Sequence, residues 1–479
     1  MTAKELFEIV FNKARDYGMK AKNDGRTIVD NKGNTIVRNN LSDASFADGS
    51  AYFGFLTSNE ETNGQYCDLS FVVFPEKTLG SAVIALGVGS SGFREDGVLA
   101  SSPGLRRRFL RLQETTDKVF FKTSFDDINT TSRDLLKEIR ENYPGLAAVI
   151  NTYKTVLPAS CIVSLDDKNK DKSLSVIFQW LAVYASIRDW GTKDQQVTIG
   201  QVLEEIPTLP IPDEEAEIRD LLKERKYVVL QGAPGTGKTF TALKIAEQYD
   251  YVFFEQFHAE TTYSDFVYGL EPNTEAQVGD SQFRPKEGIL YKAIKQASDA
   301  SEPRVLLIID EINRANLSNV LGPVFYLFEY QHGKRATEFS IGDIKLSQMP
   351  ANLHVLATMN TADRSLAVVD FALRRRFAWY TLRPHSLQIE DSSLCFREKE
   401  FQALSSIFFD FATDEELSLQ PGPSYFIVPK VKSKEAMRKR FVYELMPLIK
   451  EYLAEGYLPK AKDSFVTFFQ KETGILMYE

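Results

Sequence analysis

The sequence predicts an α/β protein, in which a parallel sheet flanked by helices is followed by a helical subdomain and preceded by an α+β domain. Three observations predict this organisation: strand-like runs separated by glycines in the first part, alternating strands and helices in the middle, and helical periodicity alone at the end. We expect domains at 1–195, 214–384 and 385–479. A linker is expected at 196–213, because three prolines lie close together there.

The composition is that of a globular protein that works inside the cell. Of the 479 residues 43% are hydrophobic, which suffices for packed cores, and the net charge of −9 argues against a uniformly basic nucleic-acid coat. No apolar run is long enough for a membrane span, and the first residues do not resemble a signal peptide, so we expect a cytoplasmic location without membrane contact. Three scattered cysteines are too few for a disulfide framework or a zinc cluster.

The first domain is expected to mix helices with strands. Apolar residues recur at helical spacing near the N-terminus and again later in the domain, and the intervening runs alternate as strands do. The expected strands are 50–55, 68–74 and 81–88, and the expected later helices are 133–143 and 174–187.

The rest of the chain alternates between the two element types before it becomes helical. A helix is expected at 214–226, and a short helix at 366–373 precedes three arginines. The expected strands are 227–230, 251–254, 305–309 and 353–358, and the expected helices of the last subdomain are 401–411 and 435–452. Short apolar strands separated by helices are typical of a parallel sheet.

A phosphate loop follows the first of these strands. The run K-Y-V-V-L-Q-G-A-P-G-T-G-K-T at 226–239 contains G-x-x-x-x-G-K-[ST] between a strand and a helix. Glycines allow backbone N–H groups to close around phosphate oxygens, Lys238 reaches the β and γ phosphates, and Thr239 offers its hydroxyl to Mg²⁺. The predicted nucleotide-binding residues are Gly232, Ala233, Pro234, Gly235, Thr236, Gly237, Lys238 and Thr239.

Two adjacent carboxylates end the strand at 305–309. Side chains alternate along a strand, so Asp310 and Glu311 cannot both point the same way. We expect Asp310 to join Thr239 in the Mg²⁺ shell and Glu311 to orient and polarise the attacking water. An acidic turn after a strand is the alternative interpretation.

Polar and basic side chains follow the next strand. Asn360, at its end, is expected to hold the water beside the γ phosphate, although asparagine is also common in turns. Arg374, Arg375 and Arg376 could reach the nucleotide of a neighbouring copy in a ring, where an arginine supplied in trans raises the rate by about 10³ to 10⁵. A solvated helix end is an equally good interpretation of any single one of them.

The motifs together resemble those of the McrB family, the AAA+ GTPase subunits of a modified-cytosine restriction system. The resemblance covers about 227–426 and rests on G-A-P-G-T-G-K-T, I-I-D-E-I-N-R-A-N-L-S, M-N-T-A-D-R-S-L-A-V-V-D-F-A-L-R-R-R-F and P-S-Y-F. It implies an AAA+ P-loop fold with a helical lid. It also implies a hexameric ring that hydrolyses GTP with Mg²⁺, is stimulated by an McrC-like nuclease subunit and translocates DNA until cleavage occurs.

The same resemblance assigns roles that residue types alone do not give. Asp363 and Arg364 become candidates for coupling to the partner subunit, and GTP becomes the expected nucleotide, with ATP as the open alternative. A MoxR-like ATPase that remodels a protein partner has a similar set of motifs, and a nucleotide-gated scaffold without catalysis is a further alternative. No nuclease constellation stands out, so cutting is expected from the partner.

The resemblance does not extend to the first domain, where DNA recognition is expected from the general architecture of the family. The concentrated basic element there contains Arg106, Arg107, Arg108 and Arg111 beside Phe109, which suits phosphate contact with stacking and equally suits a solvated helix face. Reading 5-methylcytosine or another modified cytosine in a duplex requires a pocket for a flipped base. The aromatic residues that could line such a pocket, or equally could belong to the hydrophobic core, are Tyr52, Phe53, Phe55, Tyr66, Phe71, Phe74 and Phe93.

Overall fold

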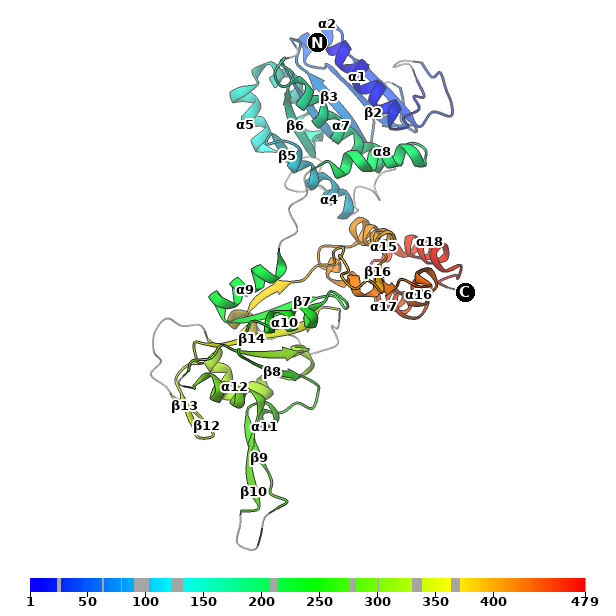
Figure 1. The fold of residues 1–479 in the computed structure, drawn as a ribbon. Helices are drawn as coiled ribbons and strands as arrows, with labels where there is room; N and C mark the ends of the chain where they lie inside the picture. Colours follow the sequence, from blue (N-terminus) through cyan, green and yellow to red (C-terminus); the bar gives the residue numbers. More distant parts are fainter. Residues whose placement is uncertain are drawn as a thin grey trace. The chain divides into compact units, whose positions relative to one another are not determined.

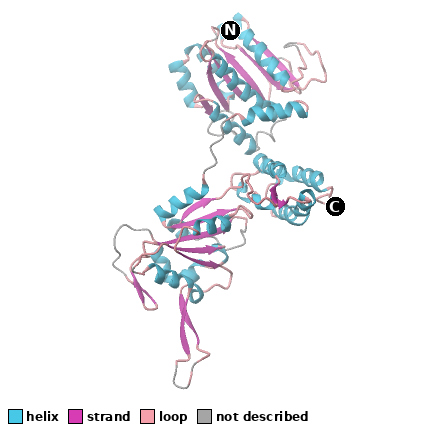
Figure 2. Cartoon of the chain, in the orientation of Figure 1, coloured by secondary structure: helices cyan, strands magenta, loops and turns pink. Residues whose placement is uncertain are grey.

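The computed structural model separates the chain into two compact units, Met1–Pro210 and Ile211–Glu479. The structure describes residues 1–23, 27–62, 64–78, 80–89, 103–121, 132–206, 213–275, 277, 281–299, 301–329, 338–362 and 371–478. No helix among the described residues is long and apolar enough to cross a membrane. Figures 1 and 2 show the two units.

The first unit is a six-stranded antiparallel sheet with helices on both faces (Figure 1). The strand order is β1-β2-β3-β4-β6-β5, so each strand from β1 to β4 pairs with its neighbour in sequence. The strands are β1 (Thr35–Asn40), β2 (Tyr52–Thr57), β3 (Leu69–Pro75), β4 (Ser81–Val88), β5 (Val119–Phe121) and β6 (Ala159–Ser164). The helices are α1 (Ala3–Asp16), α2 (Asp43–Asp48), α4 (Pro103–Arg111), α5 (Arg133–Asn142), α6 (Ala147–Tyr153), α7 (Lys170–Ile187) and α8 (Lys193–Glu204). The predicted α+β architecture is confirmed.

Two hydrophobic cores cover the two faces of this sheet. Phe71 and Val73 of β3 face the core formed with α1, α7 and α8, whereas Val72 and Phe74 face the core formed with α5 and α6. Since side chains alternate along a strand, burial on both faces favours a mainly apolar run. All residues of β3 and β4 are accordingly buried.

The predicted linker at 196–213 begins too early. Residues 196–204 belong to α8, and Ile199 and Ile206 are buried in the same core as α7. The apolar residues of this segment recur at helical spacing, and their burial stabilises a helix beyond the expected domain end. Strands β1, β5 and β6 were also missed, because each has only three to six residues and little alternation.

The second unit begins with the predicted parallel sheet, which is confirmed. Its order is β15-β7-β14-β11-β8, and every pair in it is parallel. The strands are β7 (Tyr227–Gly232), β8 (Tyr251–Gln256), β11 (Val305–Asp310), β14 (Leu353–Asn360) and β15 (Ala378–Thr381). The helices and hairpins around it are α9 (Glu214–Arg225), α10 (Lys238–Ala246), α11 (Tyr263–Phe266), α12 (Ile289–Ala297), α13 (Leu317–Leu321), α14 (Phe371–Arg376), β9–β10 (Tyr268–Pro272 and Phe283–Glu287) and β12–β13 (Phe339–Ile341 and Ile344–Leu346).

A helical lid follows, as predicted. It has its own hydrophobic core and a two-stranded antiparallel ribbon. Its elements are β16 (Leu394–Phe396), α15 (Glu398–Phe411), β17 (Ile427–Pro429), α16 (Ser433–Arg440), α17 (Met446–Ala454) and α18 (Lys462–Thr473). A π-helical turn at Phe441–Leu445 joins α16 to α17.

One half-buried histidine makes the stability of the second unit depend on pH. His354 on β14 is hydrogen-bonded through Nδ1 to the Tyr249 hydroxyl at 2.6 Å, and burial, helped by the charge of Lys226, lowers its pKa from 6.5 to about 4. In the unfolded chain His354 is protonated below about pH 6.5, whereas in the folded chain it stays neutral down to about pH 4. Lowering the pH through this window favours unfolding.

We predict that His354→Gln reduces the acid sensitivity of this unit. Between pH 7 and pH 5 the histidine costs the wild-type chain about 2 kcal/mol of stability, and the variant lacks this contribution. Urea unfolding at both pH values, followed by circular dichroism, measures the difference. An equal loss of stability in the two proteins would contradict the assignment.

Candidate functional site

The phosphate loop connects β7 to α10 in a conformation that needs glycine. Gly235 and Gly237 have φ angles of 78° and 89°, in the left-handed region that side chains other than glycine rarely adopt. A Cβ atom at Gly232 would lie 2.6 Å from the Leu382 carbonyl oxygen. Gly237 directly precedes α10, whose N-terminal N–H groups are suited to an anion.

Lys238 lies inside this loop. Its Nζ donates to the carbonyl oxygens of Gly232 at 3.0 Å and Ala233 at 2.9 Å. Burial lowers the pKa of the ammonium group, and the nearby carboxylates of Glu311 and Asp310 oppose that shift. The lysine is thus held between the loop and the acidic end of β11.

Asp310 joins two hydroxyl groups at the carboxyl end of the sheet. Its Oδ1 accepts from Thr239 Oγ1 at 2.8 Å and from Thr358 Oγ1 at 2.7 Å, and its Oδ2 accepts from Gln256 Nε2 at 3.4 Å. The structure therefore brings together the two residues predicted to hold Mg²⁺, Thr239 and Asp310. A hydroxyl and a carboxylate are the hard oxygen ligands that Mg²⁺ prefers, so these residues fit the ion.

A magnesium ion at this place would be held by few protein ligands. Within the described ranges, no group of three or more His, Cys, Asp or Glu side chains is placed to bind a metal. Mg²⁺ commonly takes one or two protein ligands and completes its shell with water and substrate phosphates. The pair Thr239 and Asp310 has that character.

The backbone turns out of strand β11 at Glu311. Its φ of 55° is unusual for a residue with a side chain, and its N–H donates to Thr358 Oγ1 at 3.0 Å. The carboxylate pairs instead with Arg314, whose Nε lies 3.3 Å from Oε2. The left-handed turn separates the two carboxylates, so Asp310 is buried while Glu311 stays partly accessible.

Thr358 is the site residue that the sequence interpretation missed. Its hydroxyl binds the Asp310 carboxylate and accepts the N–H of Glu311, and thereby links both acidic residues to β14. Its position could have been found from the strand register, because Ala357 pairs with Ile309 and the next residues on the two strands are Thr358 and Asp310.

Asn360 lies beside the phosphate loop. It pairs with Gly232 in the register of β14 and β7, and the next residue, Thr361, donates its N–H to the Gly232 carbonyl at 3.1 Å. The side-chain Oδ1 of Asn360 accepts from the N–H of Ala362 at 3.2 Å, which fixes the amide at the strand end. Asn313 Nδ2 lies 3.5 Å from the Asn360 carbonyl oxygen.

The lid contacts the loop through its backbone. Gly422 and Ser424 donate their N–H groups to the carbonyl oxygens of Pro234 at 2.9 Å and Gly235 at 3.1 Å. A Cβ atom at Gly422 would lie 2.1 Å from the carbonyl carbon of Gly235. The Thr361 hydroxyl adds a bond of 2.8 Å to the Ser418 carbonyl oxygen.

The three arginines differ in their surroundings. Arg374 is exposed and lies over the ring of Trp379. Arg375 is exposed and Arg376 is buried, and both donate to Glu329 Oε1, at 2.7 and 2.9 Å. Most of the helix predicted at 366–373 lies outside the described residues. The described helix α14 runs from Phe371 to Arg376, so the arginines form its last turn and do not follow its end, which corrects the prediction.

The arginines also lie at the opposite end of the sheet from the phosphate loop of their own chain. Strand β15 starts directly after them, and Ala378 pairs with Val228 near the beginning of β7. The loop follows the other end of β7, whose six residues span roughly 17 Å. An arginine of α14 is therefore far from the phosphates bound by the same chain.

Several predicted site residues cannot be placed. Asp363, Arg364 and Phe93 lie outside the described residues, as does the side chain of Arg106. The adjacent Arg107 is half-buried.

The predicted stacking role of Phe109 is wrong. Its ring is fully buried in the core of the first unit, because α4 packs its apolar side against the sheet and α7. Arg108 donates to Ser186 Oγ at 3.2 Å, and Arg111 lies 3.4 Å from the Leu203 carbonyl oxygen. At least these two basic side chains of α4 contact the neighbouring helices.

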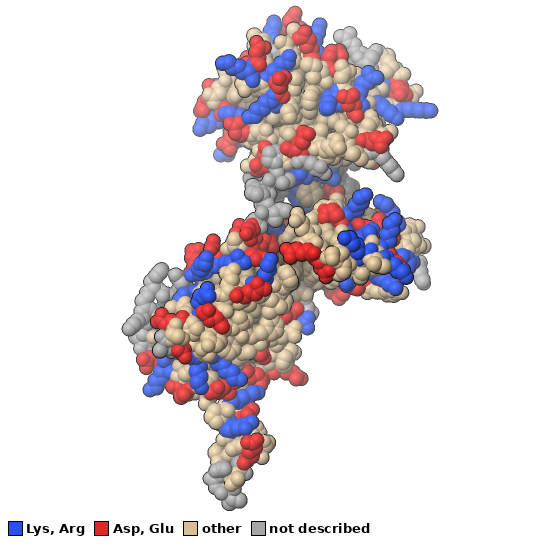
Figure 3. All heavy atoms as spheres, in the orientation of Figure 1, with Lys and Arg blue, Asp and Glu red and all other residues tan. Residues whose placement is uncertain are grey.

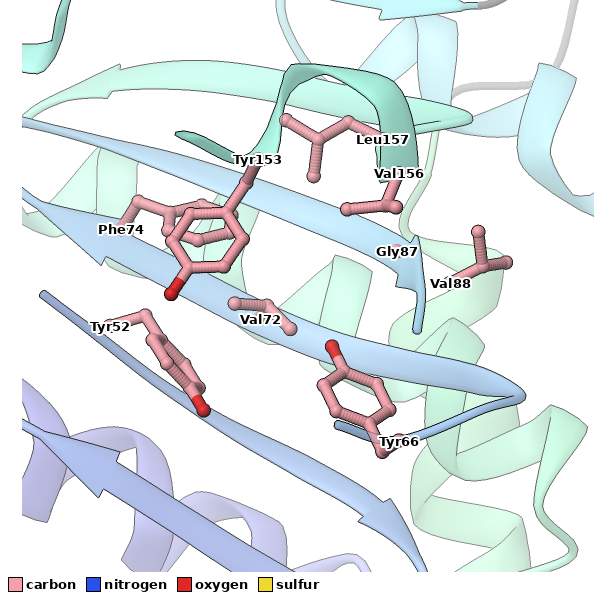
Figure 4. A pocket seen from close by; sticks show the side chains of 9 residues that line it. All are labelled: Tyr52, Tyr66, Val72, Phe74, Gly87, Val88, Tyr153, Val156 and Leu157. Atoms are coloured by element: carbon pink, nitrogen blue, oxygen red, sulfur yellow. The ribbon is translucent and has the colours of Figure 1, made fainter. Parts of the chain in front are cut away.

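The aromatic residues expected to line a base pocket separate onto two faces of the sheet. Tyr52, Tyr66 and Phe74 line a cavity with Tyr153, shown in Figure 4. The cavity measures about 20 Å³, which is room for about one water molecule. A base does not fit there in this conformation. The other described candidates are fully buried in the opposite core: Phe53, Phe55 and Phe71.

The backbone contact between lid and loop leads to a prediction. Gly422→Ala places a methyl group against the loop and is expected to lower nucleotide affinity at least about 10-fold, because the loop must shift to relieve the clash. Fluorescence titration with a labelled nucleotide measures this. Gly200→Ala, which meets no atom within 4 Å, is the matched control, and equal affinities of the two variants would contradict the assigned contact.

Comparison with known proteins agrees with this geometry. Residues 227–377 match the family described as AAA domain, dynein-related subfamily. The chain is 43% identical over 185 residues to the type IV methyl-directed restriction enzyme EcoKMcrB subunit of Escherichia coli, which covers 36% of this chain and 39% of that protein. It is 28% identical over 215 residues to the type II restriction enzyme BsuMI component YdiS of Bacillus subtilis, covering 36% of this chain and 62% of that protein.

The matches thus span less than two thirds of either relative. They agree with the resemblance found in the phosphate loop, the acidic strand end and the sensor strand. Residues 227–377 therefore match an AAA domain, and the chain is similar over part of its length to subunits of two restriction enzymes.

Proposed function

We propose that the chain is the motor and DNA-recognition subunit of a modification-dependent restriction system, and that it hydrolyses GTP in preference to ATP. The observation that carries the proposal is the hydrogen bond between the buried Asp310 carboxylate and Thr239. Thr239 follows Lys238 in the sequence, and the charge of Asp310 acts on the Lys238 ammonium group. This is the arrangement that phosphoryl transfer needs, since catalysis there rests on positioning and on charge stabilisation. The restriction context comes from the two relatives, both named as components of restriction enzymes.

Each residue of the site has a proposed role. The loop from Gly232 to Thr239 binds the phosphates, with Lys238 on the β and γ oxygens. Thr239 and Asp310 hold Mg²⁺, which when bound neutralises the charge of the phosphates. Glu311 accepts a proton from the attacking water, and Asn360 holds that water in line.

Glu311 is the better of the two carboxylates for the role of base. Asp310 is almost completely buried, accepts three hydrogen bonds and is assigned to the magnesium ion, so it has no lone pair left for a proton from water. Glu311 is partly accessible, pairs with Arg314 at 3.3 Å and lies near Lys238. A carboxylate with free lone pairs close to the loop can accept a proton from water.

An arginine from a second copy completes the site in this proposal. Arg374 and Arg375 are exposed but lie at the far end of the sheet from their own phosphate loop. Arg376 is less suited, because it is buried over the ring of Phe325 and binds Glu329. A head-to-tail contact between copies brings an exposed arginine to the neighbouring loop, and such contacts form rings when they close. We infer a hexamer.

An exposed apolar surface lies where the neighbouring copy would pack. Phe240 and Leu243 of α10 are 71% and 50% exposed, and Val252 and Phe254 of the edge strand β8 are 43% and 42% exposed. Phe240 directly follows Thr239, so this surface borders the nucleotide site. Exposed apolar clusters beside a binding site favour a protein contact.

DNA and a nuclease subunit are the proposed partners. The first unit is proposed to bind DNA that carries modified cytosine more tightly than unmodified DNA, and equal affinities at one salt concentration would contradict this. The nuclease subunit would be McrC-like, with Asp363 and Arg364 in the coupling to it. Cutting is assigned to that subunit.

The first test is hydrolysis of GTP and ATP by the purified chain with its partner subunit. We expect GTP to be preferred, and Glu311→Gln to lower kcat by about 10² to 10⁴ while nucleotide affinity is kept, because the variant loses the proton acceptor and not the phosphate contacts. Lys238→Ala is the control that loses affinity. A clear preference for ATP would contradict the GTP assignment, and unchanged hydrolysis by Glu311→Gln would contradict the catalytic assignment.

A second test mixes two inactive variants. One carries Arg374→Ala and Arg375→Ala and keeps an intact phosphate loop, and the other carries Lys238→Ala and keeps both arginines. If the arginines act in trans, mixed assemblies recover hydrolysis that neither variant shows alone. Persistent inactivity of the mixture, with assembly verified by light scattering, would place the arginines outside the reaction.

A further inference from the structure

The lid carries a concentrated basic segment around α16. Between residues 430 and 440 the chain has six lysines and arginines and one acidic residue, Glu435, although the whole chain has a net charge of −9. Figure 3 shows Lys and Arg side chains gathered on this subdomain. The sequence interpretation assigned the basic element to α4 and missed this one.

The local fold points these cations to the outside. Met437 and Phe441 are buried in the lid core, which anchors one side of α16. Lys430 and Lys432 precede the helix and Lys434 is its second residue, and all three are exposed. The basic side of the helix therefore faces solvent.

Part of this positive charge is neutralised, because Arg440 pairs with Glu444 at 2.6 Å. No carboxylate within the described part of the chain lies at ion-pair distance from Lys430, Lys432 or Lys434. Lys439 pairs with Glu435 at 3.6 Å, but both side chains are more than half exposed, so the pair is weak. Three cations of this short segment, Lys430, Lys432 and Lys434, therefore have no carboxylate partner in the described part of the chain.

An exposed aromatic ring follows α16, one helical turn after Lys439. Tyr443 is 75% exposed, whereas Phe441 and Leu445, at the two ends of the same π-helical turn, are buried. The π-helical turn is an uncommon geometry that often occurs at functional sites. It carries a flat ring outward within four residues of Lys439, and Val431, at 80% exposed, adds apolar surface.

Cations and an exposed ring together fit one kind of partner better than others. Phosphates are bound by lysine and arginine without regard to sequence, and an aromatic ring stacks on any unpaired base. Nucleic acid uses both features.

We propose that Lys430, Lys432, Lys434, Lys439 and Tyr443 form a second DNA contact surface, on the lid, in which the lysines bind phosphates and Tyr443 stacks on a base of an unpaired strand. This surface deepens the proposed function, since it rests on DNA being the partner. It differs from the proposed reader in the first unit because it recognises no modification. A motor that moves along DNA needs a contact of this sequence-independent kind.

The test uses the full chain and unmodified oligonucleotides, single-stranded and duplex, with fluorescence anisotropy at several salt concentrations. The triple variant Lys430→Gln, Lys432→Gln, Lys434→Gln is expected to bind single strands more weakly and to reduce the slope of log K against log salt by about 2, since each lost phosphate contact removes roughly 0.7. The matched control is Lys223→Gln, Lys345→Gln, Lys399→Gln, which removes the same charge from exposed positions of the same unit.

Tyr443 is tested separately. Tyr443→Ala is expected to weaken single-strand binding roughly 10-fold with little effect on duplex, and Tyr443→Phe is expected to restore it, because stacking needs the ring and not the hydroxyl. Basal nucleotide hydrolysis and the ratio of affinities for modified and unmodified duplex should stay unchanged in all of these variants.

The outcomes separate the lid surface from the proposed function. Wild-type affinity and salt slope in the triple variant overturn the DNA surface on the lid, even if the chain distinguishes modified DNA. Loss of binding to the nuclease subunit with DNA binding intact overturns it as well, in favour of an acidic protein partner. Failure of the wild-type chain to distinguish modified from unmodified DNA contradicts the reader alone and leaves the lid result valid.

Discussion

The Asp310 carboxylate is the point on which the nucleotide site depends. It accepts hydrogen bonds from three elements, the start of α10 through Thr239, strand β14 through Thr358 and strand β8 through Gln256. A buried carboxylate is costly unless it is well satisfied, so these bonds are strong constraints on the relative positions of the strands and the helix. Replacing one donor would leave charge unsatisfied at the place where the loop and the acidic strand end meet.

Thr358 extends this constraint to the residue proposed as the base. Its hydroxyl donates to Asp310 and accepts from the backbone of Glu311, so one side chain fixes both acidic residues. The left-handed backbone of Glu311 then directs the two carboxylates apart. Adjacent acidic residues can in this way take different tasks, one in a buried ion shell and one facing the reaction.

The sequence predicted the parallel sheet well, because its strands are short apolar runs flanked by helices and its loop motif requires one local geometry. It predicted less of the first unit, where β5 has three residues and the end of α8 coincides with the expected linker. The stacking role predicted for Phe109 from residue type alone was also wrong. An aromatic ring beside four arginines suits stacking, but its burial depends on α4 packing against α7, a tertiary contact that local sequence does not encode. Thr358 was missed for the same reason, since its role arises from the pairing of β14 with β11.

The separation of the arginines from their own phosphate loop has a consequence for how activity depends on concentration. In the proposed ring, each chain offers arginines at one end of its sheet and needs one at the other, so an open row of copies has one fewer completed site than it has members. Only closure of the ring completes every site. In the proposed arrangement a dimer is half active at most, and the rate per chain rises steeply over the concentration range in which rings close, which confines turnover to the assembled state.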